Sequence, residues 1–443
     1  MYQQMTLFAE HPDMPIDTDF RSNMERHRYR FRETDIGDIT FQTGQRESVH
    51  RWYRLTPSFS PGVVRFFLSY FDIDRNSVVL DPFSGRGTTI IECQKLGIPG
   101  IGCEINPLLH KTGVSSLIWK LCDIGLFDNY AEELRDSLDK YGKKDIHDVL
   151  KKIGAELPNI HDVFRWWKPD VLKDLLIARE LSKKSEYKKI YNYLWLCLNQ
   201  TCLDCANIHR NHPTISFDDN HNRNIDVFSC VNDFLSTVKT DLKSITKEER
   251  LFNGLGKIKL HDSKDMGLLN AEEKISCVIT SPPYPNRFSY IHQTRPQLYF
   301  MEMLKERKDA TEIDLESIGG TWGRATSVLT KGDRLIDIPD ELADILSYIP
   351  RLREKSLLMC NYATKYFLNL HQHIRSLKKI CGKNFRGAYV VGNSRLSDVE
   401  IYTETILSKI FGLNGFDVDE IIVFRKRGGR KKLYESAVCV RRS

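Results

Sequence analysis

The chain has 443 residues, of which 41% are hydrophobic, and a formal net charge of +6. No apolar run reaches the roughly 18 residues that a transmembrane helix needs, and the first residues lack the basic and apolar regions of a secretory signal peptide. We therefore expect a globular, cytoplasmic protein with no membrane association. The 11 cysteines follow no disulfide framework, which favours reduced thiols. The modest positive charge is compatible with a polyanionic partner without requiring one.

Residues 1–40 are polar and charged with few apolar repeats, and we predict a tail or a loosely packed arm there. Within this arm, Gln4–Phe8 resembles the short pentapeptide by which bacterial proteins bind the replicative sliding clamp. Short matches of this kind also arise by chance. A sliding clamp is therefore a candidate partner that deletion of the segment would test.

The first strong strand pattern is Ser77–Leu80, and an apolar helical pattern runs from Ile90 to Leu96. The turn between them, residues 81–89, reads Asp-Pro-Phe-Ser-Gly-Arg-Gly-Thr-Thr. A second short strand is predicted at Ile101–Glu104, so this segment predicts a β-α-β unit and a parallel sheet with helices on its faces. A glycine-rich turn that leads into a helix exposes backbone N–H groups and lets a ligand approach the main chain closely.

Two acidic residues narrow the kind of ligand. Asp81 ends the first strand, where its carboxylate can accept a hydrogen bond from an ammonium group. Glu104 ends the second strand, where an acid can bind both hydroxyls of a ribose. Because a carboxylate beside the glycines repels a pyrophosphate, the pattern favours a cofactor with an amino-acid end over a dinucleotide. The alternative is a tight turn without a ligand.

The chain between residues 108 and 250 is rich in Lys, Glu, Leu and Ile at helical spacing, and we interpret it as a mostly helical insertion between two strands. Residues 41–107 and 251–443 form the predicted α/β core. In its second part, strands are predicted at residues 256–260, 275–279, 388–392, 418–424 and 436–440, and a helix at residues 399–410.

A second motif, Thr280-Ser281-Pro282-Pro283-Tyr284, directly follows the strand at 275–279. Two successive prolines end a strand and fix φ at both positions, at the sheet edge where α/β folds bind ligands. The hydroxyl of Ser281 and a fixed carbonyl at Pro282 are suited to accept both hydrogens of an aromatic amine. Tyr284 offers a flat ring on which a base can stack. The alternative is a rigid loop with a half-buried tyrosine.

The two motifs together resemble those of the amino-methyltransferases that modify DNA. The resemblance implies a Rossmann-like class I methyltransferase fold, with a mostly parallel twisted sheet and helices on both faces, and S-adenosyl-L-methionine as cofactor. The segment His50–Pro61 resembles the part that wraps the methionine end of the cofactor, and Asp262 stands where an acid often lies near its adenine. The implied cofactor-binding residues are Phe59, Asp81, Phe83, Gly85, Gly87, Thr88, Glu104 and Asp262.

The resemblance also implies a substrate and a reaction. A serine before Pro-Pro-Tyr is typical of the branch that methylates the exocyclic N4 of cytosine, whereas Asp or Asn is typical of the adenine-N6 branch. The substrate would be double-stranded DNA with the target base flipped out of the helix. The implied catalytic residues are Ser281, Pro282, Pro283 and Tyr284. Adenine-N6 methylation, guanine-N2 methylation of RNA and a non-catalytic DNA-binding subunit stay open as alternatives, and a cognate restriction endonuclease is a candidate partner.

Candidate DNA contacts lie in four places. Asn286 and Arg287 follow the catalytic motif, and the aromatic and basic cluster 164–169 lies in the insertion. Residues 305–345 form a candidate recognition loop within the core. A basic hairpin at residues 425–432 suits phosphates, and its cations are Arg425, Lys426, Arg427, Arg430, Lys431 and Lys432. Each region has a structural alternative, as a surface loop, a solvated hairpin tip or hydrophobic core.

One group of residues has metal-capable side chains: Cys202, Cys205, His209 and His212. The gap between the cysteine pair and the histidine pair is much shorter than in a zinc finger. Because the cysteine pair continues an apolar helix, we expect buried thiols and no metal.

Overall fold

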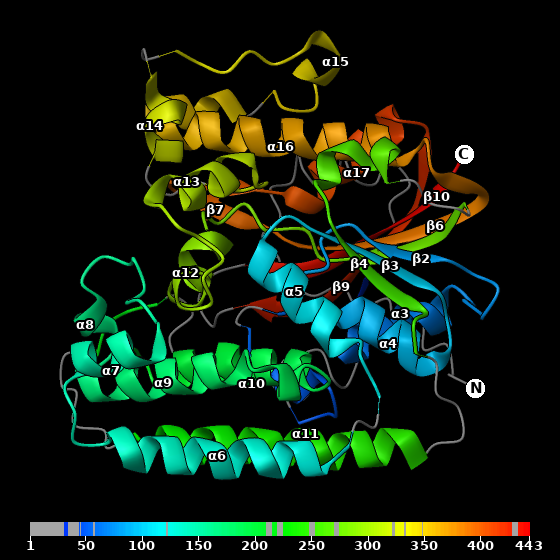
Figure 1. The fold of residues 1–443 in the computed structure, drawn as a ribbon. Coiled ribbons are helices and arrows are strands. Elements are labelled where there is room, and N and C mark those ends of the chain that lie inside the picture. Colours follow the sequence, from blue (N-terminus) through cyan, green and yellow to red (C-terminus); the bar gives the residue numbers. More distant parts are fainter. Residues whose placement is uncertain are drawn as a thin grey trace.

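The computed structural model describes residues 31–33, 44, 46–55, 58–120, 123–209, 215–218, 225–247, 253–269, 274–320, 324–331, 334–347, 349–427 and 433–443. A sheet of eight strands forms its centre (Figure 1). The strands are β1 (Phe31–Glu33), β2 (Val79–Asp81), β3 (Gly100–Glu104), β4 (Gly256–Leu260), β5 (Ile275–Thr280), β6 (Cys381–Gly392), β9 (Phe416–Arg427) and β10 (Leu433–Arg442). A separate antiparallel pair consists of β7 (Ser394–Leu396) and β8 (Val399–Ile401).

The strand order is β1-β9-β10-β6-β5-β2-β3-β4. Every pairing is parallel except the two that β10 makes with β6 and β9. From β2 the chain moves outward through β3 to β4 and then returns to place β5 on the other side of β2. This reversal puts a topological switch point between β2 and β5, and ligands bind beyond the carboxyl ends of strands at such a point. The predicted fold class is confirmed.

Helices cover both faces of the sheet, so its central strands are apolar on both sides. On one face, α3 (Pro61–Tyr70) and α4 (Thr88–Leu96) pack with Val79 of β2 and Cys277 of β5. On the other face, α16 (Leu357–Leu377) and α17 (Thr403–Leu413) pack with Leu80 and Val278. The alternation of these four buried side chains follows from the two-residue period of a strand.

A helical layer lies beside the sheet (Figure 1). It packs into one apolar cluster with Trp52 of the short helix η1 (His50–Trp52), with Leu108 of α5 (Pro107–Ser116) and with Leu298 of α12 (Tyr290–Phe300). α5 itself contacts β3 and β4. The helices of the layer are α6 (Gly125–Tyr141), α7 (Ile146–Ile153), α8 (Val163–Trp166), α9 (Pro169–Ser182), η2 (Ser185–Tyr187), α10 (Tyr191–Asp204) and α11 (Val227–Lys247).

Shorter helices occupy the connections of the core. They are η3 (Ser263–Leu268), α13 (Arg307–Glu316), α14 (Arg324–Thr330), α15 (Asp340–Ala343) and η5 (Ile349–Glu354). α13, α14 and α15 lie within the stretch 305–345 that the sequence presents as a recognition loop. No helix in the described ranges has the length and apolar character needed to cross a membrane.

The helix predicted at residues 399–410 begins later than predicted. Val399–Ile401 forms β8, which pairs with β7 across a turn where Ser397 and Asp398 have positive φ. α17 therefore begins at Thr403. In the predicted N-terminal arm, Phe31–Glu33 forms β1 and pairs in parallel with β9. The clamp-like segment Gln4–Phe8 lies outside the described residues.

Candidate active site

A cavity of about 260 Å³ lies beyond the carboxyl ends of β2, β3 and β5, at the switch point of the sheet. Both sequence motifs contribute to its wall. The residues predicted from the sequence that line it are Phe59, Asp81, Phe83, Gly85, Thr88, Glu104, Asp262, Ser281, Pro282, Pro283, Tyr284, Asn286 and Arg427. The fold therefore brings together residues from segments that lie about 200 positions apart in the chain, as in the 2.6 Å hydrogen bond from Thr280 Oγ1 to Asp81 Oδ1.

The two glycines of the first motif have different surroundings. Gly85 lines the cavity with φ of +52°, and a Cβ added there would meet no atom within 4 Å. Gly87 precedes α4 with φ of +91°, and an added Cβ would lie 2.7 Å from Ile258 Cδ1. Gly87 is not among the described residues that line the cavity. Gly85 thus leaves room for a ligand, whereas Gly87 permits close packing at the start of α4.

The two predicted acids lie at the cavity wall, where Asp81 is buried and Glu104 is partly buried. Asp81 is 2% exposed, its Oδ1 also accepts a 3.1 Å hydrogen bond from the Phe83 N–H, and burial raises its pKa to about 6. Glu104 accepts 2.8 Å bonds from the N–H groups of Gly85 and Asn106, and burial raises its pKa to about 7. A carboxylate that has lost water gains free energy from a cation or a hydrogen-bond donor. The wall therefore suits a ligand with an ammonium group and hydroxyls.

The Ser-Pro-Pro-Tyr turn connects to the last strands of the sheet. Ser281 Oγ donates to Tyr284 Oη at 3.5 Å, and Tyr284 Oη donates to Glu435 Oε1 of β10 at 2.5 Å. Burial raises the pKa of Tyr284 well above its ordinary value, so the hydroxyl keeps its proton. The Arg427 guanidinium lies 5.0 Å from the centre of the Tyr284 ring and donates to the Asn393 carbonyl. Sequence analysis missed Glu435, because only the tertiary structure brings it to the turn.

A further residue of the first motif has a role that the sequence did not indicate. Arg86 is 4% exposed, and its guanidinium donates to Ser58 Oγ at 3.0 Å and to the carbonyls of His50 and Tyr53. Burial lowers its pKa to about 10. These bonds attach the segment that carries Phe59 to the glycine turn. The predicted cofactor-wrapping segment is thus held to the cavity by a side chain of the turn itself.

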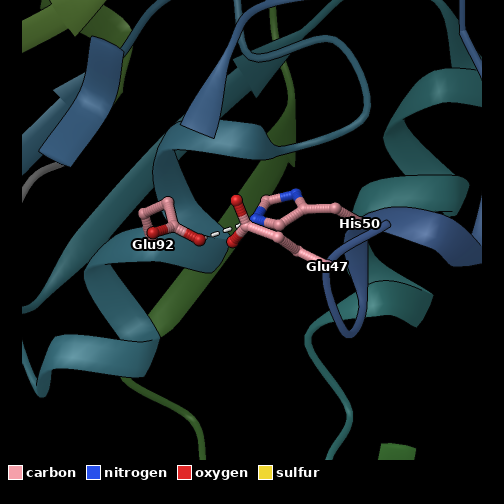
Figure 2. A group of neighbouring side chains, drawn as sticks. All are labelled: Glu47, His50 and Glu92. Atoms are coloured by element: carbon pink, nitrogen blue, oxygen red, sulfur yellow. Dashed lines mark hydrogen bonds and ion pairs between the residues drawn. The ribbon is translucent and has the colours of Figure 1, made fainter. Parts of the chain in front are cut away.

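Glu47, His50 and Glu92 form the one group of metal-capable side chains in the described part of the chain, and Figure 2 shows them close together. His50 Nε2 lies 2.6 Å from Glu92 Oε1, and burial lowers the pKa of His50 to about 4, so the ring is neutral. Arg65 donates to both glutamates, and Lys95 Nζ lies 3.0 Å from Glu92. Because these cations already compensate the carboxylates, the group serves to hold η1 against α4.

The cysteines of the metal-capable group noted in the sequence are not part of the Glu47, His50 and Glu92 cluster. Cys202 and Cys205 are buried free thiols, and Cys202 Sγ donates to the Asn199 carbonyl at 3.3 Å. His212 is outside the described residues.

The candidate DNA contacts are only partly within the cavity. Asn286 and Arg287 are exposed, and Arg287 has φ of +59° with its N–H bonded to the Tyr362 hydroxyl at 3.0 Å. Arg427 was predicted as a phosphate contact of a basic hairpin; its partly buried guanidinium lies against the Tyr284 ring, because β9 ends beside the Ser-Pro-Pro-Tyr turn, and the phosphate contact stays a prediction. The structure describes the backbone of Arg425 and Lys426 in β9, whereas Arg430, Lys431 and Lys432 lie outside the described residues.

The sheet order and the two motifs at its switch point define a Rossmann-like methyltransferase. Residues 61–114 match the family model described as DNA methylase, which spans N6 and N4 enzymes. The chain is 25% identical to the type II methyltransferase M.BsoBI of Geobacillus stearothermophilus, over 88% of this chain and 83% of that protein. It is 21% identical to M.AvaI of Nostoc sp., over 92% and 86% of the two chains. A shorter match, 28% identical over 24% of this chain and 23% of the relative, is to M.MjaII of Methanocaldococcus jannaschii. The chain is thus similar to the amino-methyltransferases of the DNA methylase family, both in this segment and along most of its length.

Proposed function

We propose that the protein transfers a methyl group from S-adenosyl-L-methionine to the exocyclic N4 of a cytosine flipped out of double-stranded DNA. The observation that carries the proposal is the shared cavity: the Ser-Pro-Pro-Tyr turn and the acids Asp81 and Glu104 line the same space. The hydrogen bond between Thr280 and Asp81 joins the two motifs directly. A donor bound at the acids and a base held at the turn would therefore be neighbours.

The cavity wall fits the proposed cofactor. When bound, S-adenosylmethionine supplies an electrophilic methyl group on a positively charged sulfur. Asp81 would accept from its ammonium group and Glu104 from its ribose hydroxyls, because both side chains line the cavity. The open space at Gly85 admits a ligand close to the backbone, and Phe59 adds an apolar surface.

The catalytic turn would activate the amine. The lone pair of an exocyclic amine is delocalised into the ring, so hydrogen bonds from both amine hydrogens are needed to orient it. A carboxylate only accepts hydrogen bonds, so Tyr284 donates to Glu435 and Ser281 donates to Tyr284. Because the one proton of Ser281 Oγ is donated to Tyr284, the lone pairs of Oγ can accept one hydrogen of the amine. The Pro282 carbonyl would accept the other. Positioning of this kind is a major source of rate enhancement.

The biological setting follows from the relatives. Those named above are type II methyltransferases, and we propose that this enzyme protects cytoplasmic DNA from a cognate restriction endonuclease. Binding of a sliding clamp through Gln4–Phe8 is a separate proposal. Loss of clamp binding on deletion of residues 1–10 is the expected result, and unchanged binding would end it.

The test is transfer of tritium from labelled S-adenosylmethionine to plasmid DNA, followed by nucleoside analysis. N4-methylcytosine is the expected product, and N6-methyladenine as the sole product would replace the cytosine assignment with the adenine alternative. The double variant Ser281→Ala, Tyr284→Ala is the control, and it should retain cofactor binding by calorimetry while losing transfer. A wild-type protein that neither binds the cofactor nor modifies DNA would instead be a non-catalytic subunit.

A further inference from the structure

A second cavity, of about 360 Å³, lies between the helical layer and the helices that follow the catalytic turn. Arg165, Trp166 and Phe217 line it from the helical layer, and His292 and Arg295 line it from α12. Three further residues line both cavities: Ser289, Ile291 and Asp314. A molecule that occupies the second cavity is therefore adjacent to a base held at the turn.

The wall of this cavity combines guanidinium groups with aromatic rings. The Arg165 guanidinium lies 4.1 Å from the centre of the Phe217 ring, and that of Arg295 lies 5.3 Å from the Trp166 ring. The Trp166 and Phe217 rings are 4.7 Å apart in an edge-on arrangement. Next to them, Phe164 has 40% of its surface exposed. Trp166 is buried, so the rings open to stacking with a nucleobase are those of Phe164 and the partly buried Phe217. An arginine fork pairs with the O6 and N7 atoms of guanine.

Acidic residues in the wall of the second cavity favour a base over a phosphate as its ligand. Asp162 and Asp314 line the cavity beside the two arginines, and Asp314 accepts a 2.5 Å hydrogen bond from Ser289 Oγ. Carboxylates repel a phosphate but accept hydrogen bonds from the amino groups of bases. The wall therefore offers hydrogen-bond donors from the arginines and acceptors from the carboxylates. This combination suits the edge of a base, which itself carries both donors and acceptors.

We propose that this second cavity reads a base of the DNA recognition sequence next to the methylated base, with Arg165 and Arg295 contacting the edge of that base. The inference rests on the proposed DNA methyltransferase function. It also assigns a role to the aromatic and basic cluster of the insertion: the cluster and α12 read the sequence together. Because Ser289 is the N-cap of α12 and follows the Ser-Pro-Pro-Tyr turn by only a few residues, occupancy of this cavity would be coupled to the position of the turn.

The experiment compares Arg165→Ala and Arg295→Ala with a matched control, Arg386→Ala. Arg386 is exposed, lies in the middle of β6 and lines neither cavity, so its removal subtracts the same charge away from the second cavity. The readouts are cofactor affinity, binding of short duplexes of randomised sequence followed by sequencing of the bound fraction, and mapping of methylated sites in plasmid DNA. We expect cofactor affinity within about twofold of wild type in all three variants.

In the two cavity variants we expect one base position of the preferred sequence to lose its discrimination by about 5- to 100-fold. Arg165→Lys keeps the charge but not the fork, so it should lose the same discrimination while binding duplexes that lack the preferred sequence as tightly as wild type. An unchanged sequence preference in both alanine variants, or a uniform loss of affinity for every sequence, would overturn the proposal. If the wild-type protein methylated no DNA, the proposed function would fail, and the duplex selection would still decide the role of the cavity.

Discussion

The hydroxyl of Tyr284 donates a 2.5 Å hydrogen bond to Glu435 Oε1, and the two residues are 151 positions apart in the chain. Tyr284 belongs to the proline-rich turn after β5, whereas Glu435 belongs to the last strand. A hydrogen bond to a charged group contributes about 1.5–3 kcal/mol. Glu435 therefore restrains both the Tyr284 ring and the direction in which its hydroxyl proton points.

The hydrogen bond between Tyr284 and Glu435 predicts that substitutions of the two residues lower the activity to different extents. Tyr284→Phe keeps the ring but removes the donor, and Glu435→Gln keeps an acceptor but removes the charge. We expect both to lower kcat for methyl transfer by about tenfold, whereas Tyr284→Ala, which also removes the stacking surface, should lower it by about 100-fold or more. Single-turnover transfer of labelled methyl groups measures this. Equal activity of Tyr284→Ala and Tyr284→Phe would show that the ring has no role.

Asp81→Asn separates cofactor binding from folding. Both the Phe83 N–H and the Thr280 hydroxyl donate to Oδ1 of Asp81, so an asparagine oxygen can accept both bonds. The variant should fold, yet lose at least about tenfold in affinity for S-adenosylmethionine because the charge opposite the ammonium group is gone. Calorimetric titration measures the affinity, and wild-type affinity would refute the assignment of Asp81.

The same substitution predicts a change in the pH dependence of stability. The ordinary pKa of Asp81 is 3.8, and burial in the folded protein raises it to about 6. The folded state therefore keeps a proton that the unfolded chain releases, so this residue lowers the free energy of unfolding as pH rises from about 4 to about 6. In the absence of cofactor, the free energy of unfolding of Asp81→Asn should equal that of wild type near pH 4 and exceed it by about 2–3 kcal/mol at pH 8. Denaturant titrations across this range test the sign. Burial raises the pKa of Glu104 in both proteins, and the Asp81 charge raises it further in wild type, so the difference between the two proteins reports Asp81 together with its effect on Glu104.

The two glycines of the first motif should respond differently to alanine. Gly87→Ala combines φ of +91° with a 2.7 Å approach to Ile258, so we expect a loss of about 2 kcal/mol or more in stability. Gly85→Ala has φ of +52° and open space at Cβ, so it should cost about 1 kcal/mol in stability but weaken cofactor binding by entering the cavity. Thermal denaturation and calorimetry on both variants distinguish the two roles. A reversed order would contradict them.

Arg86 should control the order of the wrapping segment. Arg86→Met removes the donors to Ser58 and to the carbonyls of His50 and Tyr53 while keeping an apolar stem. We expect faster amide hydrogen exchange at residues 50–55 and 58–60 and weaker cofactor binding, because Phe59 lies in that segment. Arg75→Met, a change of the same size at an exposed site, is the control. Exchange rates equal to wild type would contradict the role of Arg86.

The sequence by itself determined the two motifs and the β-α-β unit. Gly85 and Gly87 adopt the positive φ that glycine permits, Pro282 and Pro283 end β5 as two prolines must, and the apolar runs beside them form strands. These features follow from local backbone preferences and from short periodicities of hydrophobic residues. They therefore identify the two motifs that contribute to the cavity wall.

Only the tertiary structure decided how that wall is completed. Glu435 and Arg427 reach Tyr284 because β9 and β10 lie beyond β6 in the sheet. Arg165 shares a cavity with Arg295 because the helical layer packs on α12. Contacts between residues more than 100 positions apart depend on strand order and on the packing of side chains, and no local pattern of residues encodes either.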